Sequence, residues 1–114
     1  MARPRRPTRS EWDAAVAAGF RPDGATWAPD SILGVRVGSS DASFAHALLP
    51  ANLHDYRYWT RSLERFDADR EFLDGLQRAL RAHLYGWRLR LGLLIARRYW
   101  LEVRTRGKAF YWRD

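Results

Sequence analysis

The residues best suited to chemistry lie in residues 52–74, NLHDYRYWTRSLERFDADREFLD. His54 and Tyr58 are four positions apart, so in a helix they lie one turn apart on the same face. Two aspartates, Asp67 and Asp69, follow after a short gap. A carboxylate near that face could orient the imidazole of His54, as a histidine general base requires. The same groups could instead form a buried network that joins two helices. The stretch therefore predicts a His–Asp cluster that is either catalytic or structural.

Two helices are needed to position these side chains. The first is expected within residues 41–60, with a break at Pro50, which suits the first turn of the helix that carries His54. A loop at residues 61–66 would then return the chain. The second helix is expected at residues 67–84. Its first turn would hold both aspartates, where the helix dipole favours negative charge, so they also have a structural interpretation. The apolar stripe of this helix is Phe72, Leu76, Leu80 and Leu84.

The N-terminal part of the chain predicts a short helix and a hairpin. The helix is expected at residues 10–18, capped by Ser10 and ended by Gly19. Turn signals then separate two extended pieces, at residues 25–27 and 32–37, which could pair as a small β-hairpin. Both elements are interpreted as scaffold for the His–Asp cluster.

The C-terminal part predicts a long final helix at residues 87–105, followed by an apolar tail at residues 109–112. The expected buried stripe of this helix is Leu91, Ile95, Tyr99 and Val103. The arginines expected largely outside it are Arg90, Arg97, Arg98 and Arg104. The predicted fold class is thus mainly α: one small domain with an antiparallel helix pair, a long C-terminal helix and a small hairpin.

Length and composition fit a single small domain. The chain has 114 residues, enough for one core. Residues 1–9 are expected to be a flexible basic arm, and residues 10–114 the helical domain. The absence of cysteine excludes disulfides and thiolate metal sites. The N-terminus has no apolar run typical of a secretory signal, and residues 89–96 are too short to span a bilayer. A cytoplasmic or virion-associated protein is expected.

Charge is distributed unevenly along the chain. The formal net charge is +7, and residues 75–113 hold ten Lys and Arg residues against Glu102 alone. Such a field favours an anionic partner, which could be a phospholipid membrane, an acidic protein or nucleic acid. The alternative is an arginine-rich surface that is solvated and binds nothing.

The motif HDxxY at residues 54–58, followed by ADxxF at residues 68–72, resembles the phospholipase A2 superfamily, and most closely its cysteine-free viral forms. The order of motifs looks even more like a small phage-borne family of unknown function. In that family an Asp-x-x-Ser segment precedes the HD motif, and the candidate for it here is Asp30-Ser31. An aromatic-x-x-Val-Arg-x-x-Gly stretch ends the last helix, here at residues 99–107. The resemblance covers roughly residues 23–107.

This resemblance implies a site and a cofactor. His54 would be the general base that takes a proton from water. Asp69 would orient His54 through its other ring nitrogen, with Asp67 as the fallback. Tyr58 would hydrogen-bond to the second aspartate. Asp55 would ligate calcium, which would polarise an ester carbonyl and stabilise the oxyanion.

The sequence is compatible with three functions. The first is a calcium-assisted ester hydrolase, for which residues 34–38 are the nearest counterpart of the family's glycine-rich calcium loop. The second is a phage or prophage protein in which the constellation is degenerate and structural, and which binds a virion component or a host protein. The third is a nucleic-acid-binding module that uses the arginine face, with strong salt dependence.

Overall fold

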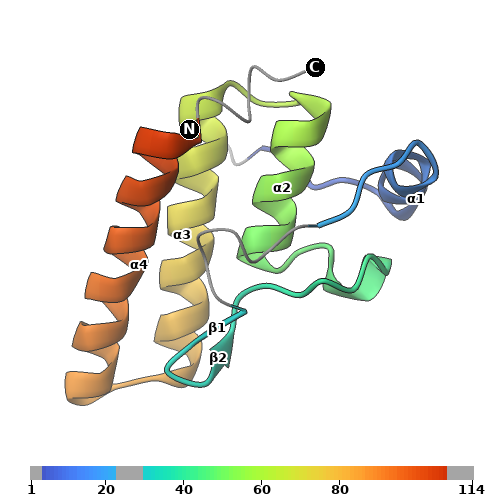
Figure 1. Ribbon diagram of the computed structural model, residues 1–114. Coiled ribbons are helices and arrows are strands. Elements are labelled where there is room, and N and C mark those ends of the chain that lie inside the picture. Colours follow the sequence, from blue (N-terminus) through green and yellow to red (C-terminus); the bar gives the residue numbers. More distant parts are fainter. Residues whose placement is uncertain (1–3, 23–29, 108–114) are drawn as a thin grey trace.

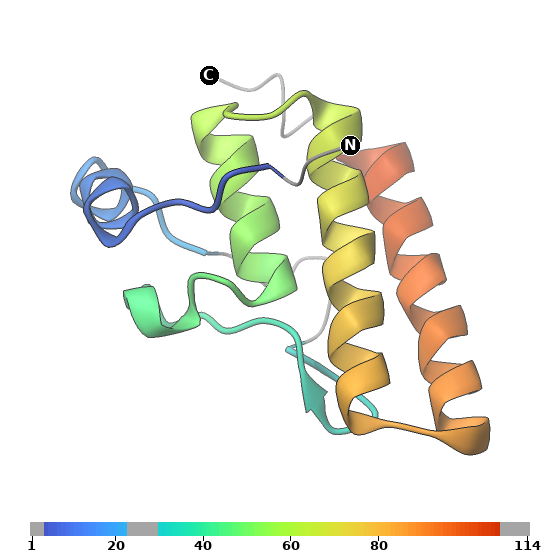
Figure 2. The same ribbon diagram turned by 180° about the vertical axis from the view of Figure 1, so that it is seen from behind.

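Three long helices lie side by side in one layer, with α3 between α2 and α4 (Figure 1). The computed structural model describes residues 4–22 and 30–107. A shorter helix, α1, lies beyond α2, and a two-stranded hairpin lies near the end of the layer where α3 turns into α4 (Figure 2). The helices are α1 (Arg9–Ala17), α2 (Pro50–Thr60), α3 (Arg65–His83) and α4 (Gly86–Arg106). The predicted mainly helical domain, with its antiparallel pair, long last helix and small hairpin, is confirmed.

The main core forms along α3, whose apolar residues recur every four positions. Two glycines allow its neighbours to approach closely. A Cβ atom on Gly75 would lie 3.2 Å from the side chain of Pro50 on α2. A Cβ atom on Gly92 of α4 would lie 3.3 Å from Leu84. The residues of the predicted stripe that are buried are Phe72, Leu76 and Leu80.

α1 begins one residue earlier than predicted, and its cap is Thr8 rather than Ser10. Thr8 Oγ1 accepts from the Glu11 N–H at 3.2 Å, and a Glu11 carboxylate oxygen accepts from the Thr8 N–H at 2.8 Å. This reciprocal pair is a capping box, and it needs a glutamate three residues after the cap. Trp12 packs inward as predicted and stacks on Tyr56 of α2, with ring centroids 5.4 Å apart.

The prediction of a helix across residues 41–49 is wrong, because only a 3-10 turn at Phe44–His46 forms there. Asp41 Oδ1 accepts from the Ser43 N–H at 2.9 Å, and Ser39 Oγ accepts from the Asp41 N–H at 3.0 Å. Side-chain oxygens thus bind N–H groups in a turn geometry that competes with a helix.

The hairpin pairs β1 (Ser31–Ile32) with β2 (Val35–Arg36). Leu33 and Gly34 form its two-residue turn, and both have positive φ, at 49° and 84°. Such turns follow the natural twist of the strands and favour glycine. The hairpin therefore spans residues 31–36 and overlaps the second predicted extended piece, residues 32–37, in all but its first residue. The first predicted piece, at residues 25–27, lies outside the described residues.

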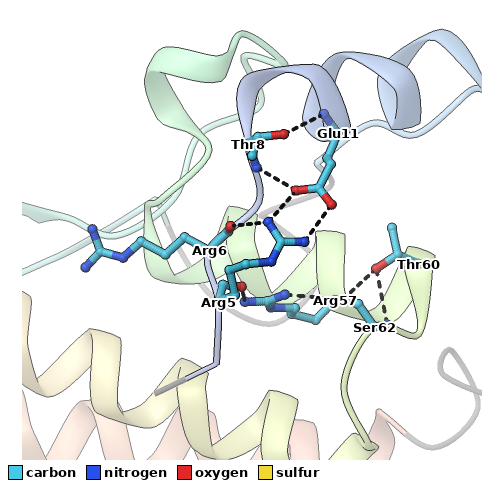
Figure 3. Close-up of polar contacts among 7 residues, drawn as sticks. All are labelled: Arg5, Arg6, Thr8, Glu11, Arg57, Thr60 and Ser62. Atoms are coloured by element: carbon cyan, nitrogen blue, oxygen red, sulfur yellow. Dashed lines mark hydrogen bonds and ion pairs between the residues drawn. The ribbon is translucent and has the colours of Figure 1, made fainter. Parts of the chain in front are cut away.

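A buried arginine connects the N-terminal segment to the helical layer (Figure 3). Arg57 is 4% exposed and donates from Nη2 to the carbonyl oxygen of Arg5 at 2.8 Å. It also forms a two-point ion pair with Glu71 of α3, at 3.0 and 3.1 Å. Arg5 in turn pairs with Glu11 at 2.8 Å (Figure 3). The flexibility expected for residues 1–9 stays a prediction.

The buried stripe predicted for α4 is confirmed in part, because Val103 is buried and Ile95 and Tyr99 pack partly buried against the core. Leu91 is the exception at 40% exposed, and the small residues Gly92 and Ala96, which the prediction left out, enter the core. The fully buried residues are Gly92, Ala96 and Val103. The tail expected at residues 109–112 lies outside the described residues. Across the described part of the chain, no helix combines the length and apolar character that crossing a membrane requires.

Candidate functional site

α2 and α3 bring three of the predicted residues together. His54 Nε2 lies 2.7 Å from Asp69 Oδ1, and Tyr58 Oη donates to the same oxygen at 2.5 Å. The rings of His54 and Tyr58 have centroids 4.3 Å apart, which confirms that they share one face of α2. Asp67, the alternative partner, is exposed in the first turn of α3. Asp69 is therefore the aspartate that meets His54.

α4 contributes a further side chain, which the sequence interpretation did not assign to the cluster. Arg104 Nη1 donates to Asp69 Oδ2 at 2.7 Å. Arg104 is outside the buried stripe of α4, as expected, but its guanidinium reaches inward to this carboxylate. Arg104 is the arginine in the Val-Arg-x-x-Gly part of the stretch at residues 99–107, but this pattern did not indicate which residue it contacts. Asp69 thus joins α2, α3 and α4.

The cluster lies in the protein interior. Asp69 has no exposed surface and His54 is 6% exposed. The imidazole also packs against Phe72, with ring centroids 4.8 Å apart. A buried carboxylate has to be compensated by hydrogen bonds or opposite charge, and both oxygens of Asp69 are compensated here.

The contacts determine the protonation states. Burial acts to raise the pKa of Asp69, but the hydrogen bonds from His54, Tyr58 and Arg104 outweigh it, so the pKa lies below its ordinary value. Asp69 is therefore ionised, and the Nε2 atom of His54 carries the proton that it donates. Burial, and then the hydrogen bond to Asp69, raise the pKa of Tyr58 well above its usual range. The phenol therefore keeps its proton at neutral pH and donates a hydrogen bond to Asp69.

Two further residues secure the C-terminal end of α4 beside the cluster. Arg65 of α3 donates from Nη2 to the carbonyl oxygens of Val103 and Arg104, at 3.0 and 2.5 Å. A cation at this position complements the negative end of the helix dipole. A Cβ atom on Gly107 would lie 2.7 Å from Tyr58 Oη, so the glycine leaves room for the phenol.

The residues expected to hold calcium lie on α2 and around strand β2, and calcium binding stays a prediction. Asp55, the predicted ligand, is half-buried on α2. Residues 34–38 include a hairpin turn and strand β2, and the carbonyl oxygen of Val37 accepts from the Ala51 N–H at 2.9 Å. Calcium prefers oxygen ligands, and in this loop the carbonyl oxygen of Val37 is already engaged by a backbone N–H. Within residues 4–22 and 30–107, no group of three or more His, Cys, Asp or Glu residues could hold a metal ion.

A groove of about 580 Å³ lies elsewhere, between the N-terminal segment, α2 and α3. Its lining contains neither His54 nor Tyr58 nor Asp69. It combines apolar residues of α2 with acidic and basic residues of α3, and it is not an opening onto the His–Asp cluster. Its lining includes Arg6, Pro50, Leu53, Phe66, Asp74 and Arg78.

Comparison of the chain with protein-family models, with curated proteins and with solved structures finds no match.

Proposed function

We propose that this chain is a binding protein in which the cluster of His54, Tyr58, Asp69 and Arg104 joins three helices and performs no hydrolysis. One observation carries the proposal: Asp69 is completely buried, and both its oxygens accept hydrogen bonds from the other helices. This arrangement supports a role in holding α2, α3 and α4 in register.

Charge also supports the structural role. In a catalytic pair, the carboxylate stabilises the positive charge that the imidazole gains when it takes a proton. Here Arg104 already places a positive charge against Asp69, at 2.7 Å. The negative charge of Asp69 is therefore shared with Arg104 and is not reserved for His54.

The test compares ester hydrolysis and stability in matched histidine variants. Wild type, His54→Asn and His83→Asn are assayed with short-chain phospholipid esters, with and without calcium. His83 is the control because it is exposed on α3. We expect no hydrolysis above background in any of them. We also expect His54→Asn, but not His83→Asn, to lower the free energy of unfolding by about 2 kcal/mol. Turnover by wild type that disappears in a folded His54→Asn variant would overturn the proposal.

The second candidate is an ester hydrolase of the phospholipase A2 type. It is favoured by the contact of His54 Nε2 with Asp69 and of Tyr58 with the same oxygen, which are the contacts that the resemblance implies. Nδ1 of His54 would then take the proton from water. Calorimetry with calcium on wild type and Asp55→Ala separates the candidates. Binding that is lost in folded Asp55→Ala favours the hydrolase, and absence of binding favours the structural role.

The partner class follows from charge and from the resemblance. The net charge of +7 supports an anionic partner. The likeness to a phage-borne family supports a virion component or a host protein. Nucleic acid is the third option, and binding that does not weaken as salt is raised would exclude it.

A further inference from the structure

The outer face of α4 carries a row of exposed apolar side chains. α4 lies at the edge of the helical layer (Figure 1) and packs on α3 through the side that carries Ala96 and Val103. Along its outer side, Trp87 is 69% exposed, Leu94 67% and Leu101 51%. Together with Leu91 they follow spacings of four, three and seven residues, which places them on one helix face. Large apolar side chains grouped on a surface indicate a site of interaction.

Arginines flank this row. α4 contains six arginines and one acidic residue, Glu102. Arg90 and Arg97 are exposed on one side of the row. Glu102 is itself bridged by Arg98 at 3.7 Å and by Arg106 at 3.1 Å. The face is therefore apolar along its middle and positive along the side that carries Arg90 and Arg97.

The combination of apolar and basic side chains distinguishes between three partners: a second copy of the chain, nucleic acid and a phospholipid surface. A second copy of the chain would bring the arginines of two α4 helices together, which is unfavourable. Nucleic acid would engage the arginines through phosphates but would leave the leucines without an apolar partner. An anionic phospholipid surface satisfies both features. Apolar side chains enter the boundary between headgroups and acyl chains, and the long arginine side chains reach the phosphates.

We propose that the outer face of α4, with Trp87, Leu91, Leu94 and Leu101 flanked by Arg90 and Arg97, docks on an anionic phospholipid surface. The helix lies along the surface. This inference rests on the proposed binding function. The two fail separately, because hydrolysis that depends on His54 overturns the binding role, whereas loss of vesicle binding overturns only the lipid partner.

Co-sedimentation of the full chain with vesicles tests this inference. One set of vesicles is phosphatidylcholine alone, and the other also contains phosphatidylglycerol. We expect binding to the anionic vesicles to be about tenfold tighter. Leu94→Asn and Arg97→Gln should each weaken that binding about fivefold. The matched controls are Leu48→Asn and Arg70→Gln, exposed residues of the same types outside α4, and they should leave it unchanged.

Several outcomes would contradict docking on an anionic phospholipid surface. No binding to anionic vesicles, or equal binding to both sets, overturns the inference. An effect of Arg97→Gln without an effect of Leu94→Asn also overturns it, and it points to an anion such as an oligonucleotide that contacts only the arginines. Sedimentation that shows dimers, lost in Leu94→Asn in the absence of vesicles, assigns the face to a second copy. Circular dichroism of each variant confirms that it is folded.

Discussion

At the scale of single residues, Asp69 determines the character of the candidate site. A carboxylate without exposed surface would be strongly unfavourable if it were unpaired, and His54, Tyr58 and Arg104 compensate it. Replacing one partner of such a buried pair typically costs about 3 kcal/mol, because a charge is left uncompensated. The residue therefore stabilises the contact between helices only as part of the complete cluster.

The lowered pKa of Asp69 predicts a pH dependence of stability. Its pKa in the folded protein lies below the ordinary value of 3.8, so its contribution is complete above that value. The contribution is lost as the pH falls through the folded pKa. The difference in unfolding free energy between wild type and Asp69→Asn should thus be about 3 kcal/mol near neutral pH and shrink below about pH 4. Denaturant unfolding at several pH values measures it.

The exposed Asp67 provides the control, since Asp67→Asn should cost only a few tenths of a kcal/mol through the helix dipole. Glu11, whose pKa is lowered to about 2 chiefly by its hydrogen bond with Arg5, contributes equally to wild type and variant. A difference between wild type and Asp69→Asn that stays constant across the whole pH range would contradict the assigned role.

The residues of the cluster were partly predictable. Helical periodicity was sufficient to place His54 and Tyr58 on one face, whereas it left Asp67 and Asp69 both open as the partner, and only the resemblance favoured Asp69. Arg104 could not be placed in the same way, because its contact depends on how α4 packs against α3. An arginine at the margin of a buried stripe can point either to solvent or inward. Which direction the side chain takes depends on how the helices pack.

At the scale of elements, the ends of the helices depend on specific side chains. α2 begins at Pro50, whose missing N–H costs nothing in a first turn. α4 ends where Arg65 donates to its last carbonyl oxygens. α1 begins at a capping box at Thr8. The predicted cap was Ser10, because serine is also a good cap residue. What distinguishes Thr8 is Glu11 three positions later.

The cap of α1 gives a direct prediction. Thr8→Ala removes the hydroxyl that accepts from the Glu11 N–H, so it should lower the free energy of unfolding by about 1 kcal/mol. Ser10→Ala, within the first turn and exposed, should change it by less than about 0.5 kcal/mol. Thermal or denaturant unfolding of both variants checks this. Equal losses, or a larger loss for Ser10→Ala, would mean that the helix starts elsewhere.

At the scale of the whole molecule, two polar connections hold the helical layer and the N-terminal segment together. Asp69 links the three long helices, and Arg57 links the N-terminal segment to α2 and α3 through Arg5 and Glu71. The strongly periodic stripe of α3 was enough to predict the helical fold. The irregular residues 41–49 were mispredicted as helix, because the side chains of Ser39 and Asp41 accept hydrogen bonds from backbone N–H groups in a turn geometry that competes with a helix.

The central claim is that the Asp69 cluster holds the helices together, and a double-mutant cycle tests it most directly. Unfolding free energies are measured for wild type, Asp69→Asn, Arg104→Met and the double variant. A parallel cycle pairs Asp69→Asn with Arg97→Met, since Arg97 is exposed on the same helix. We predict a coupling above about 1 kcal/mol for Asp69 with Arg104, and additivity within about 0.5 kcal/mol for the control. Additivity in both cycles would contradict the claim.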